Sequence, residues 1–358
     1  MSLPKLTKIK LNNFRNFNEL SLEFSNQHTL LKGKNAVGKT SILEAISFLS
    51  PGNGFKKDKL DNIVNSSSNK KGANIKFFFQ YEGMNENISI NIEDKDLKLS
   101  KAYFLNDKKI TQQELLNKFQ LFWFSEQDKI YFIKDKQYHR GICNRIICYF
   151  EPNLFKLLNQ FLRLRREKKK ILLTSKDKSW LSQIDIQQRN ICENILKIKY
   201  DFMNFYKDCR NKSKNLFFEY DIFFDFENIS IFDFISKFDQ EMKNENESKG
   251  EYSLISKYDP LKNVFQLMHQ GKKINQLSSA QSKMLILSFL LDSAKFLKSQ
   301  KNKITIFLID EIFDNFDILN LQKVIHYCAK NNFQSFFSST DNFNIKEQLD
   351  NLKILSIK

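Results

Sequence analysis

One short stretch constrains this chain more than any other. Residues Gly33–Thr40 read GKNAVGKT, which is the G-x-x-x-x-G-K-T pattern of a phosphate-binding P-loop. A strand-like run precedes it at residues 28–31, and a helix-like run follows at residues 41–49. A glycine-rich turn between a strand and a helix directs backbone N–H groups and the helix N-terminus toward phosphate. The sequence therefore predicts a nucleotide-binding site here.

The P-loop pattern gives individual residues separate tasks. In such loops the lysine, here Lys39, reaches the β- and γ-phosphates, and the hydroxyl group of the next residue, here Thr40, binds Mg²⁺. Backbone groups of the other positions surround the phosphates. The predicted nucleotide-binding residues of this stretch are Gly33, Lys34, Asn35, Ala36, Val37, Gly38, Lys39, Thr40 and Ser41.

A second signal lies near the other end of the chain. Residues 304–309 form an apolar, β-branched run that predicts a buried strand, and Asp310 and Glu311 follow at its end. Carboxylates at such a point hold Mg²⁺ through water and polarise an attacking water. We therefore assign Glu311, Asp310 and Lys39 to catalysis, and Thr40 and Asp310 to the metal.

Two short strand patterns precede the P-loop, at residues 6–11 and 20–24, with Arg15 in the turn between them. Both strands are expected to flank the P-loop strand. That arrangement would place Arg15 near the nucleotide, although a solvated turn residue is the simpler interpretation.

An aromatic run at residues 121–124 predicts another buried strand, and Gln127 and Asp128 follow it. Strand ends in α/β sheets face the ligand crevice. We expect Gln127 or Asp128 either to sense the metal or the attacking water, or to cap a helix.

The middle of the chain is predicted to be helical. Residues 154–164 and 180–212 carry apolar side chains at helical spacing and are separated by a polar turn, which predicts an arm of two antiparallel helices. The run Arg163–Lys170 is strongly basic. It is expected either to contact phosphates or to be a solvated helix face. Farther on, Ser278 and Gln281 begin an apolar helix, where they would either bind an anion or only cap the helix.

Composition narrows the class of partner. The net charge of +16 fits a surface that binds a polyanion, although the abundance of Lys, Asn, Ile and Phe also fits an AT-rich coding sequence. The five cysteines and four histidines show neither zinc spacing nor a disulfide framework, so buried reduced thiols are expected. No apolar run is long enough to span a membrane and no signal-peptide core is present, so we expect a cytoplasmic protein.

The P-loop and the acidic pair lie far apart in the chain, with predicted helices between them. A nucleotide-binding head that is split in this way resembles the SMC-like branch of the ABC ATPases, and the whole chain is similar to the RecF family of bacterial recombination mediators. The matching stretches are Leu11–Phe17, Gly33–Ile46, Phe122–Asp128, Ile309–Asp317 and Ser338–Asp341.

The resemblance implies an α/β fold, an ABC/SMC-like P-loop ATPase head split by a helical insertion. Residues 1–115 and 255–358 would form the head, and residues 116–254 the inserted helical arm. ATP and Mg²⁺ would be the cofactors of an ATP-driven homodimer, in which each P-loop faces the signature segment of the partner. Besides the P-loop, this site would include Arg15, Gln127, Ser278 and Gln281.

The resemblance also implies a function. The protein would bind gapped duplex or single-stranded DNA in recombinational repair and replication restart, with RecR- and RecO-like mediators, and would help to load a recombinase. ATP hydrolysis would be slow, and no membrane partner is expected. The alternative is another ATPase of the SMC/ABC branch, either one that energises transport or a different DNA-repair head.

The signature segment departs from the family pattern, which is Ser-x-Gly-Gln followed by an arginine. Ala280 replaces the glycine and Lys283 the arginine. Ala280 adds a methyl group where the backbone approaches phosphate, and Lys283 offers a point charge in place of a planar fork. His139-Arg140 and Asn144 also depart from the family's paired arginines and aspartate. We therefore expect ATP binding with weaker dimerisation than is usual in the family.

Overall fold

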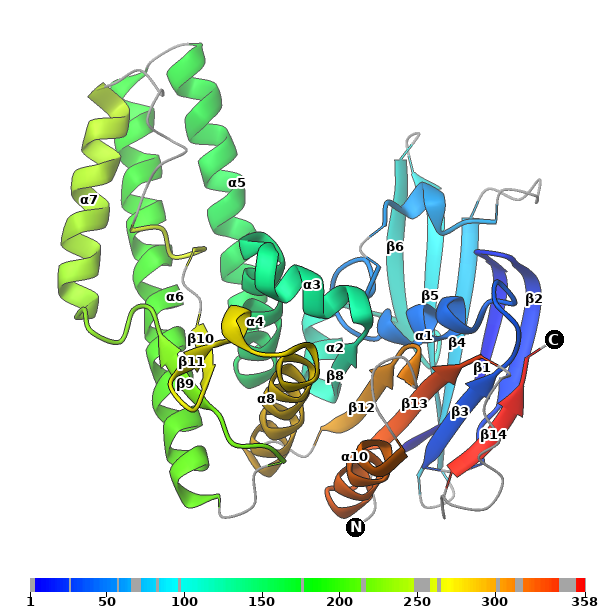
Figure 1. Ribbon diagram of the computed structural model, residues 1–358. Helices are drawn as coiled ribbons and strands as arrows, with labels where there is room; N and C mark the ends of the chain where they lie inside the picture. The colour runs from blue at the N-terminus through cyan, green and yellow to red at the C-terminus, as the bar shows by residue number, and fades with distance from the viewer. Residues whose placement is uncertain are drawn as a thin grey trace. The chain divides into compact units, whose positions relative to one another are not determined.

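The structure, a computed structural model, divides into two compact units (Figure 1). Unit 1 combines Met1–Ile130 with Ser278–Lys358, and unit 2 is Tyr131–Leu277. The structure describes residues 4–25, 27–56, 58–65, 72–81, 84–95, 98–174, 177–213, 217–247, 258–262, 265–300, 303–312, 318–340 and 352–357.

Unit 1 contains a five-stranded sheet in the order β14-β3-β13-β12-β8, in which every neighbouring pair is parallel. All six residues of β12 are buried, which is typical of a parallel strand covered on both faces. The strands are β3 (His28–Lys32), β8 (Phe119–Phe124), β12 (Ile304–Ile309), β13 (Gln334–Ser339) and β14 (Leu352–Ser356).

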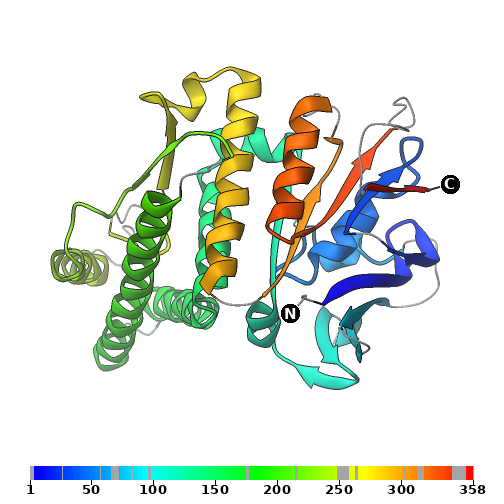
Figure 2. The same ribbon diagram turned by 90° about the horizontal axis from the view of Figure 1, so that it is seen from below.

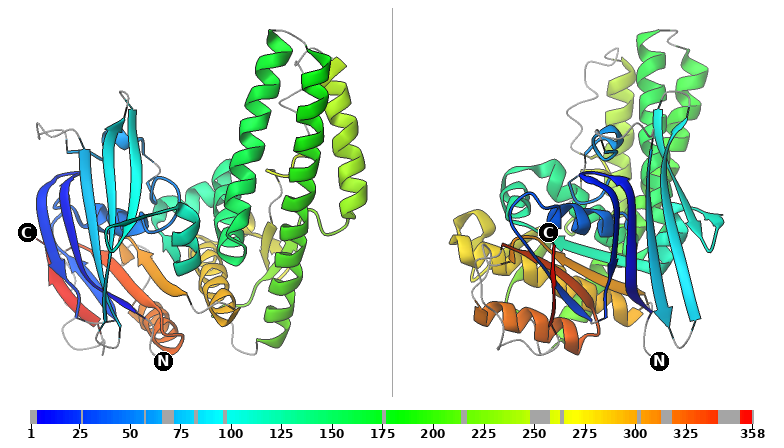
Figure 3. Two further views of the ribbon diagram at one scale, coloured as in Figure 1. Left: turned by 180° about the vertical axis from the view of Figure 1, so that it is seen from behind. Right: turned by 90° about the vertical axis from the view of Figure 1, so that its right-hand side faces the viewer.

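A second sheet of unit 1 has six strands in the order β2-β1-β4-β5-β6-β7, and all its neighbouring pairs are antiparallel. The long strands β4, β5 and β6 run side by side, and the view from behind shows the face that points away from α1 (Figure 3). The strands are β1 (Lys5–Phe14), β2 (Phe17–Glu23), β4 (Gly72–Tyr81), β5 (Met84–Lys95), β6 (Lys98–Leu105) and β7 (Lys108–Ile110).

Helix α1 (Lys39–Ser47) joins the two sheets in one hydrophobic core. Ile42 and Ile46 of α1 belong to the same buried cluster as Ile9 of the six-stranded sheet and Leu308 of the five-stranded sheet. Two helices, α8 (Ser279–Gln300) and α10 (Ile318–Lys330), run alongside β8, β12 and β13 (Figure 2). The P-loop helix is therefore held on both sides by packed sheets, which fixes its first turn. Two further helices of the first half are α2 (Gln112–Lys118) and α3 (Glu126–Lys134).

The prediction that the two N-terminal strands flank the P-loop strand is wrong. β1 and β2 belong to the six-stranded sheet, and the neighbours of β3 are β13 and β14. The reason is in the side chains: Ile9 and Leu11 of β1 are buried against α1, while alternate residues of the same strand face away from the core. A strand with one polar face fits an antiparallel sheet better than a parallel one.

Unit 2 contains the predicted helical arm. α5 and α6 pack against each other along a buried stripe that includes Leu164, Ile171, Leu181 and Ile184. A small three-stranded sheet has the order β11-β10-β9. The elements are α4 (Lys136–Phe150), α5 (Asn153–Leu173), α6 (Lys178–Lys212), β9 (Asp221–Phe224), α7 (Ile231–Glu247), β10 (Phe265–His269) and β11 (Lys272–Lys273).

The units divide at residues that differ from the predicted boundaries. The predicted insertion, residues 116–254, includes β8, which pairs with β12 inside the sheet of unit 1. The predicted head includes β10, which pairs with β9 of unit 2. Backbone pairing between distant strands decides both positions.

Among the residues that the structure describes, no helix is long and apolar enough to cross a membrane.

The basic run of α5 divides into buried and exposed cations. Lys168 is 1% exposed, and its ammonium lies 2.8 Å from an Asp185 carboxylate oxygen and 3.1 Å from one of Glu245. Arg165 lies 3.0 Å from the buried carboxylate of Asp259. Arg166 is exposed. The proposal that the whole run contacts phosphates is therefore too broad, because two of its cations hold the bundle together.

Replacing Lys168 with methionine should destabilise unit 2. The substitution keeps the length of the side chain and leaves Asp185 and Glu245 without their shared cation. Breaking a buried pair costs roughly 3–5 kcal/mol. We expect about 2 kcal/mol, because both acids retain access to water. The measurement is the free energy of urea unfolding followed by helical circular dichroism. Lys169→Met, at the exposed neighbouring position, is the control, and equal stability of the two variants would contradict the assignment.

Candidate functional site

The carboxyl ends of the parallel strands meet at one edge of the five-stranded sheet. Ile309 is in register with Phe337 of β13 and with Phe124 of β8, and Ser338 is in register with Leu31 of β3. The residues that follow each strand must therefore lie close together, although they are far apart in the sequence. This is the edge at which α/β sheets bind ligands.

The two main sequence signals meet at this edge. The Thr40 hydroxyl donates a 3.2 Å hydrogen bond to an Asp310 carboxylate oxygen. Ser338 donates to the same oxygen, and its own hydroxyl oxygen accepts a 2.8 Å hydrogen bond from the Glu311 backbone N–H. Asp310 is 8% exposed, and its N–H bonds the Phe124 carbonyl at 3.1 Å, which ties β12 to β8.

Glu311 differs from its neighbours in exposure and backbone. Its side chain is exposed, and its φ of 49° lies in the left-handed region, which non-glycine residues rarely adopt. Such a conformation costs of order 1 kcal/mol and persists where surrounding bonds enforce it. Here the Ser338 hydroxyl holds the Glu311 N–H. The carboxylate is consequently presented to solvent beside the buried Asp310.

Lys39 closes the P-loop onto itself. The lysine is 6% exposed, and its ammonium donates to the carbonyl oxygens of Gly33 at 2.7 Å and Lys34 at 2.6 Å. The remaining donor capacity of the ammonium, which has three protons, is available to a ligand. The side chain is thus already bent over the loop that precedes its own helix.

Gly38 is required by the geometry at the start of α1. Its φ is +100°, and a Cβ atom at this position would collide with the Phe17 ring and lie 2.8 Å from the Asn16 side-chain nitrogen. Asn16 belongs to the turn after β1, and Phe17 is the first residue of β2. The N-terminal strands therefore support the P-loop from outside, even though they do not pair with its strand.

These residues fit a nucleoside triphosphate with Mg²⁺. The first N–H groups of α1 lack partners within the helix, which is favourable for an anion. Hydroxyl and carboxylate oxygens are the ligands that Mg²⁺ prefers, and Thr40 and Asp310 already converge. Within the described residues, no group of three or more His, Cys, Asp and Glu side chains is placed to hold a metal. Phosphate oxygens and water molecules would complete the metal shell.

The arginine of the N-terminal turn is engaged by acids. Arg15 Nε donates to Glu44 at 2.8 Å, and its Nη2 lies 2.5 Å from both Glu44 and Asp58. Glu44 is fully buried on α1, and this burial raises the pKa of its carboxyl group against the opposing effect of Arg15. Nη1 donates to the Asn62 carbonyl at 2.8 Å. A direct contact between Arg15 and the nucleotide stays a prediction.

Gln127 and Asp128 lie in the first turn of α3. The Ser125 hydroxyl donates to the Asp128 carboxylate at 2.7 Å and accepts from the Asp128 N–H at 3.2 Å, a reciprocal helix cap. Asp128 thus follows the capping alternative. Gln127 is exposed, and its role at the metal stays a prediction.

Ser278 and Gln281 cap α8 in the same reciprocal way. The Ser278 N–H donates to Gln281 Oε1 at 3.1 Å, and the Gln281 N–H donates to Ser278 Oγ at 3.2 Å. Ser278, Ala280 and Gln281 are exposed, whereas Lys283 is 8% exposed. The start of α8 is accessible to a second molecule, and its contact with a nucleotide stays a prediction.

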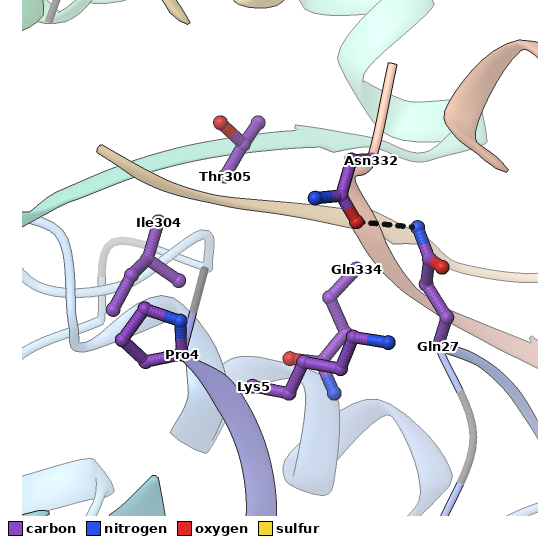
Figure 4. A pocket seen from close by; sticks show the side chains of 7 residues that line it. All are labelled: Pro4, Lys5, Gln27, Ile304, Thr305, Asn332 and Gln334. Carbon is purple, nitrogen blue, oxygen red and sulfur yellow. Dashed lines mark hydrogen bonds between the residues drawn. The ribbon is translucent and has the colours of Figure 1, made fainter. Parts of the chain in front are cut away.

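A small pocket lies at the opposite edge of the sheet (Figure 4). Its lining residues stand at the beginnings of strands. The Gln334 amide bonds both the N–H and the carbonyl of Leu6 at 2.8 Å, and Gln27 reaches Asn332 at 3.4 Å. These polar groups join the two sheets, so we assign the pocket a structural role. Its lining residues are Pro4, Lys5, Gln27, Ile304, Thr305, Asn332 and Gln334.

Ser338 is the site residue that the sequence reasoning left unassigned. The signal was available, since a buried strand ending in serines at the same edge must reach the acidic pair. None of the five cysteines, all of which lie in described parts of the chain, forms a disulfide, and four of them are buried, as expected. Asp314, Asp317 and Asp341, which belong to the stretches that carry the family resemblance, lie outside the described residues.

Comparisons with known proteins identify the family and the fold of the chain. The sequence profile described as the RecF/RecN/SMC N terminal domain matches residues 5–357. The DNA replication and repair proteins RecF of Rickettsia conorii and Rickettsia prowazekii are each 26% identical to the chain, over 96% of its length and 98% of theirs.

Solved structures show the same fold. The structure of the recombination mediator protein RecF-ATPrS in the RecFOR pathway has a TM-score of 0.80 at 19% identity, with coverage of 100% of this chain and 97% of the other. The RecF-ATP structure from the same pathway has a TM-score of 0.79 at 19% identity, with coverage of 97% and 96%. The chain belongs to the RecF/RecN/SMC N-terminal domain family, with the α/β fold of an ABC/SMC-like ATPase head and RecF proteins as its full-length relatives.

Proposed function

We propose that this protein is an ATP-dependent DNA-binding protein of recombinational repair and replication restart, with slow ATP hydrolysis. The observation that carries the proposal is the 3.2 Å bond between Thr40 and Asp310, which joins the P-loop to the acidic strand end. Its full-length relatives are named DNA replication and repair proteins, and solved relatives of the same fold are described with ATP or ATPrS.

The side chains support a division of labour in hydrolysis. Lys39 would pair with the β- and γ-phosphates by its free ammonium protons. Mg²⁺, held by Thr40 and Asp310, would neutralise charge that develops on the phosphate oxygens. The exposed Glu311 carboxylate would take a proton from water, the water oxygen would bond to the γ-phosphorus, and the bond to the ADP oxygen would break. Slow turnover is expected because the second half of the site must come from a partner.

The proposed second half is the start of α8 of another copy. Ser278 and Gln281 are exposed there and cap the helix, so its N–H groups point outward beside Ala280. A nucleotide would then lie between one P-loop and the partner's helix start. Ala280 adds a methyl group at this surface, which favours a looser dimer. Gapped duplex or single-stranded DNA, RecR- and RecO-like mediators and a recombinase are the proposed further partners.

An ATPase that energises transport is the competing function. It would bind nucleotide in the same way, so nucleotide binding does not separate the two. The net charge of +16 favours a polyanion as the partner.

The test is DNA affinity measured with and without ATP and Mg²⁺ over a salt series. We expect fluorescence anisotropy with gapped duplex DNA to show an affinity that rises with ATP. It should fall between roughly 50 and 200 mM salt by about two orders of magnitude or more, since bound phosphates release counterions. A matched experiment with Lys39→Ala should show no effect of ATP. If the affinity for DNA at low salt is the same with and without ATP, the proposal is refuted.

A further inference from the structure

One face of the six-stranded sheet carries lysines and phenylalanines. Residues on the opposite face, such as Ile9 and Phe77, are buried against α1, so alternate residues point away from the core. We call this side, with Lys10, Lys76, Phe78, Phe104 and Lys109, the outer face. Lys10 and Lys109 are exposed, and the other three are partly buried.

The strand register places these residues in a row. Lys10 of β1 lies opposite Lys76 of β4, Lys76 opposite Ser89 of β5, Ser89 opposite Phe104 of β6, and Phe104 opposite Lys109 of β7. Four strand spacings make this row about 19 Å long. In single-stranded nucleic acid that length accommodates roughly three nucleotides, taking about 6 Å for each.

Two lysines directly opposite each other are unfavourable in a sheet. Their Cβ atoms are about 5 Å apart, and like charges in such pairs destabilise the fold. The ammonium groups of Lys10 and Lys76 each lie 5.8 Å from the centre of the Phe78 ring, near the outer limit of a cation–π contact. An aromatic ring between two ammonium groups can bind a ligand that carries both an anionic group and a planar ring.

Two carboxylates on this face, Glu23 and Glu93, are engaged by other groups, whereas Glu19, which lies opposite Asn12 of β1, is an exposed carboxylate of the same face. Lys8, two residues from Lys10 on the same strand, lies 2.7 Å from Glu23. Glu93 accepts a 3.0 Å hydrogen bond from Asn91. No described carboxylate forms an ion pair with Lys10 or Lys76 within the ranges of the chain that the structure covers.

From this arrangement we infer that the outer face binds single-stranded nucleic acid, with phosphates on Lys10, Lys76 and Lys109 and bases stacked on Phe78 and Phe104. In single-stranded nucleic acid the bases are free to stack on the two aromatic rings. A duplex presents its backbone to the outside, so its bases would not contact these rings. The inference rests on the proposed DNA-binding function and adds the surface and the strandedness. It does not involve the P-loop edge of the other sheet.

The experiment uses the full chain with ATP and Mg²⁺ and a fluorescein-labelled oligothymidylate. We expect Lys10→Gln combined with Lys76→Gln to weaken binding about tenfold at low salt. The slope of log affinity against log salt should fall by about 1.4, because each single-strand phosphate contact contributes about 0.7. Lys8→Gln is the matched control, since Lys8 is on the same face and strand but already pairs with Glu23, and it should change affinity less than threefold.

A stability measurement separates binding from a structural role. The double variant should keep or slightly raise the midpoint of thermal unfolding, because a like-charge pair is removed. A lower midpoint together with lost affinity would mean that the lysines only stabilise the sheet. Phe78→Leu keeps an apolar side chain and should remove most of the preference for oligothymidylate over an abasic strand of equal length, which we expect to be roughly fivefold or more in the wild type.

The outcomes distinguish this inference from the proposed function. Wild-type protein that fails to bind any DNA at low salt would overturn both. If the Lys10 and Lys76 double variant binds DNA with unchanged affinity and an unchanged salt slope, only the inference that the outer face binds nucleic acid is overturned. The binding of poly-glutamate is measured in the same way. A Lys10 and Lys76 double variant that binds DNA as the wild type does, but no longer binds poly-glutamate, would assign the face to an acidic polypeptide and would also overturn the inference.

Discussion

Lys39→Ala should abolish tight nucleotide binding, with an affinity for ATP and Mg²⁺ reduced by about two orders of magnitude or more. Lys39 is 6% exposed, and its ammonium is already held over the loop by bonds to the carbonyl oxygens of Gly33 and Lys34. A charge-assisted hydrogen bond contributes roughly 1.5–3 kcal/mol, so losing two phosphate contacts accounts for the expected change. Equilibrium titration with a fluorescent ATP analogue measures it directly.

Lys34→Ala is the matched control for this experiment. Lys34 is the other lysine of the loop and is exposed, and the contact it makes to Lys39 comes from its backbone carbonyl, which alanine retains. We expect less than a threefold change in affinity. Lys39→Ala protein that still binds ATP within threefold of wild type would show that the P-loop assignment is wrong.

The local parts of the site could be predicted from sequence because each is a continuous motif. The P-loop, the acidic strand end and the arm helices depend on neighbouring residues and on a single periodicity. The structure brings Thr40 and Asp310 together as the two motifs imply. Their convergence needs only that both follow parallel strands of one sheet.

Strand partners were harder to predict, because the pairing of two strands depends on residues that are far apart in the sequence. The sequence placed the N-terminal strands beside β3, where the structure places β13 and β14. The alternation in β1, with Ile9 and Leu11 buried and Lys10 exposed, already indicated a sheet with one polar face. The outer face of that sheet is a consequence of register, which sequence alone does not give.

Charged runs were harder still, because a run says nothing about which side of a helix is buried. Lys168 lies four residues after Leu164 and three before Ile171, so helical spacing places it on the buried stripe. The sequence therefore contains the signal that Lys168 is buried, but the high number of basic residues in the run favoured a solvated or phosphate-binding face. Arg15 shows the same limit, since its acidic partners Glu44 and Asp58 come from other segments.

Glu311→Gln should reduce ATP hydrolysis by roughly 10²- to 10³-fold, the contribution typical of a general base. Glutamine has nearly the same shape but does not accept the proton from water. The Ser338 contact that holds this residue is made by its backbone N–H, and the substitution leaves that bond intact. ATP affinity should therefore stay within about threefold of wild type. Phosphate release under single-turnover conditions and an equilibrium titration measure the two quantities.

Two further variants make the Glu311 result specific. Asp310→Asn should lower both hydrolysis and Mg²⁺-dependent ATP binding, because Asp310 bonds Thr40 and the substitution removes the charge beside the metal. Glu19→Gln changes an exposed carboxylate of β2 and should change neither. A Glu311→Gln protein that hydrolyses ATP at the wild-type rate would remove Glu311 from catalysis.

The same variant tests the sandwich of two copies, because blocked hydrolysis preserves the ATP-bound state. Light scattering after size exclusion should show a dimer when Glu311→Gln protein is loaded with ATP and Mg²⁺, and a monomer without nucleotide. Ala280→Gly should strengthen that dimer, since it removes the methyl group at the exposed start of α8 and restores the close approach of backbone to phosphate. If Glu311→Gln blocks hydrolysis but both proteins stay monomeric with ATP, the partner's helix start does not complete the site, and hydrolysis must be carried out by one copy alone.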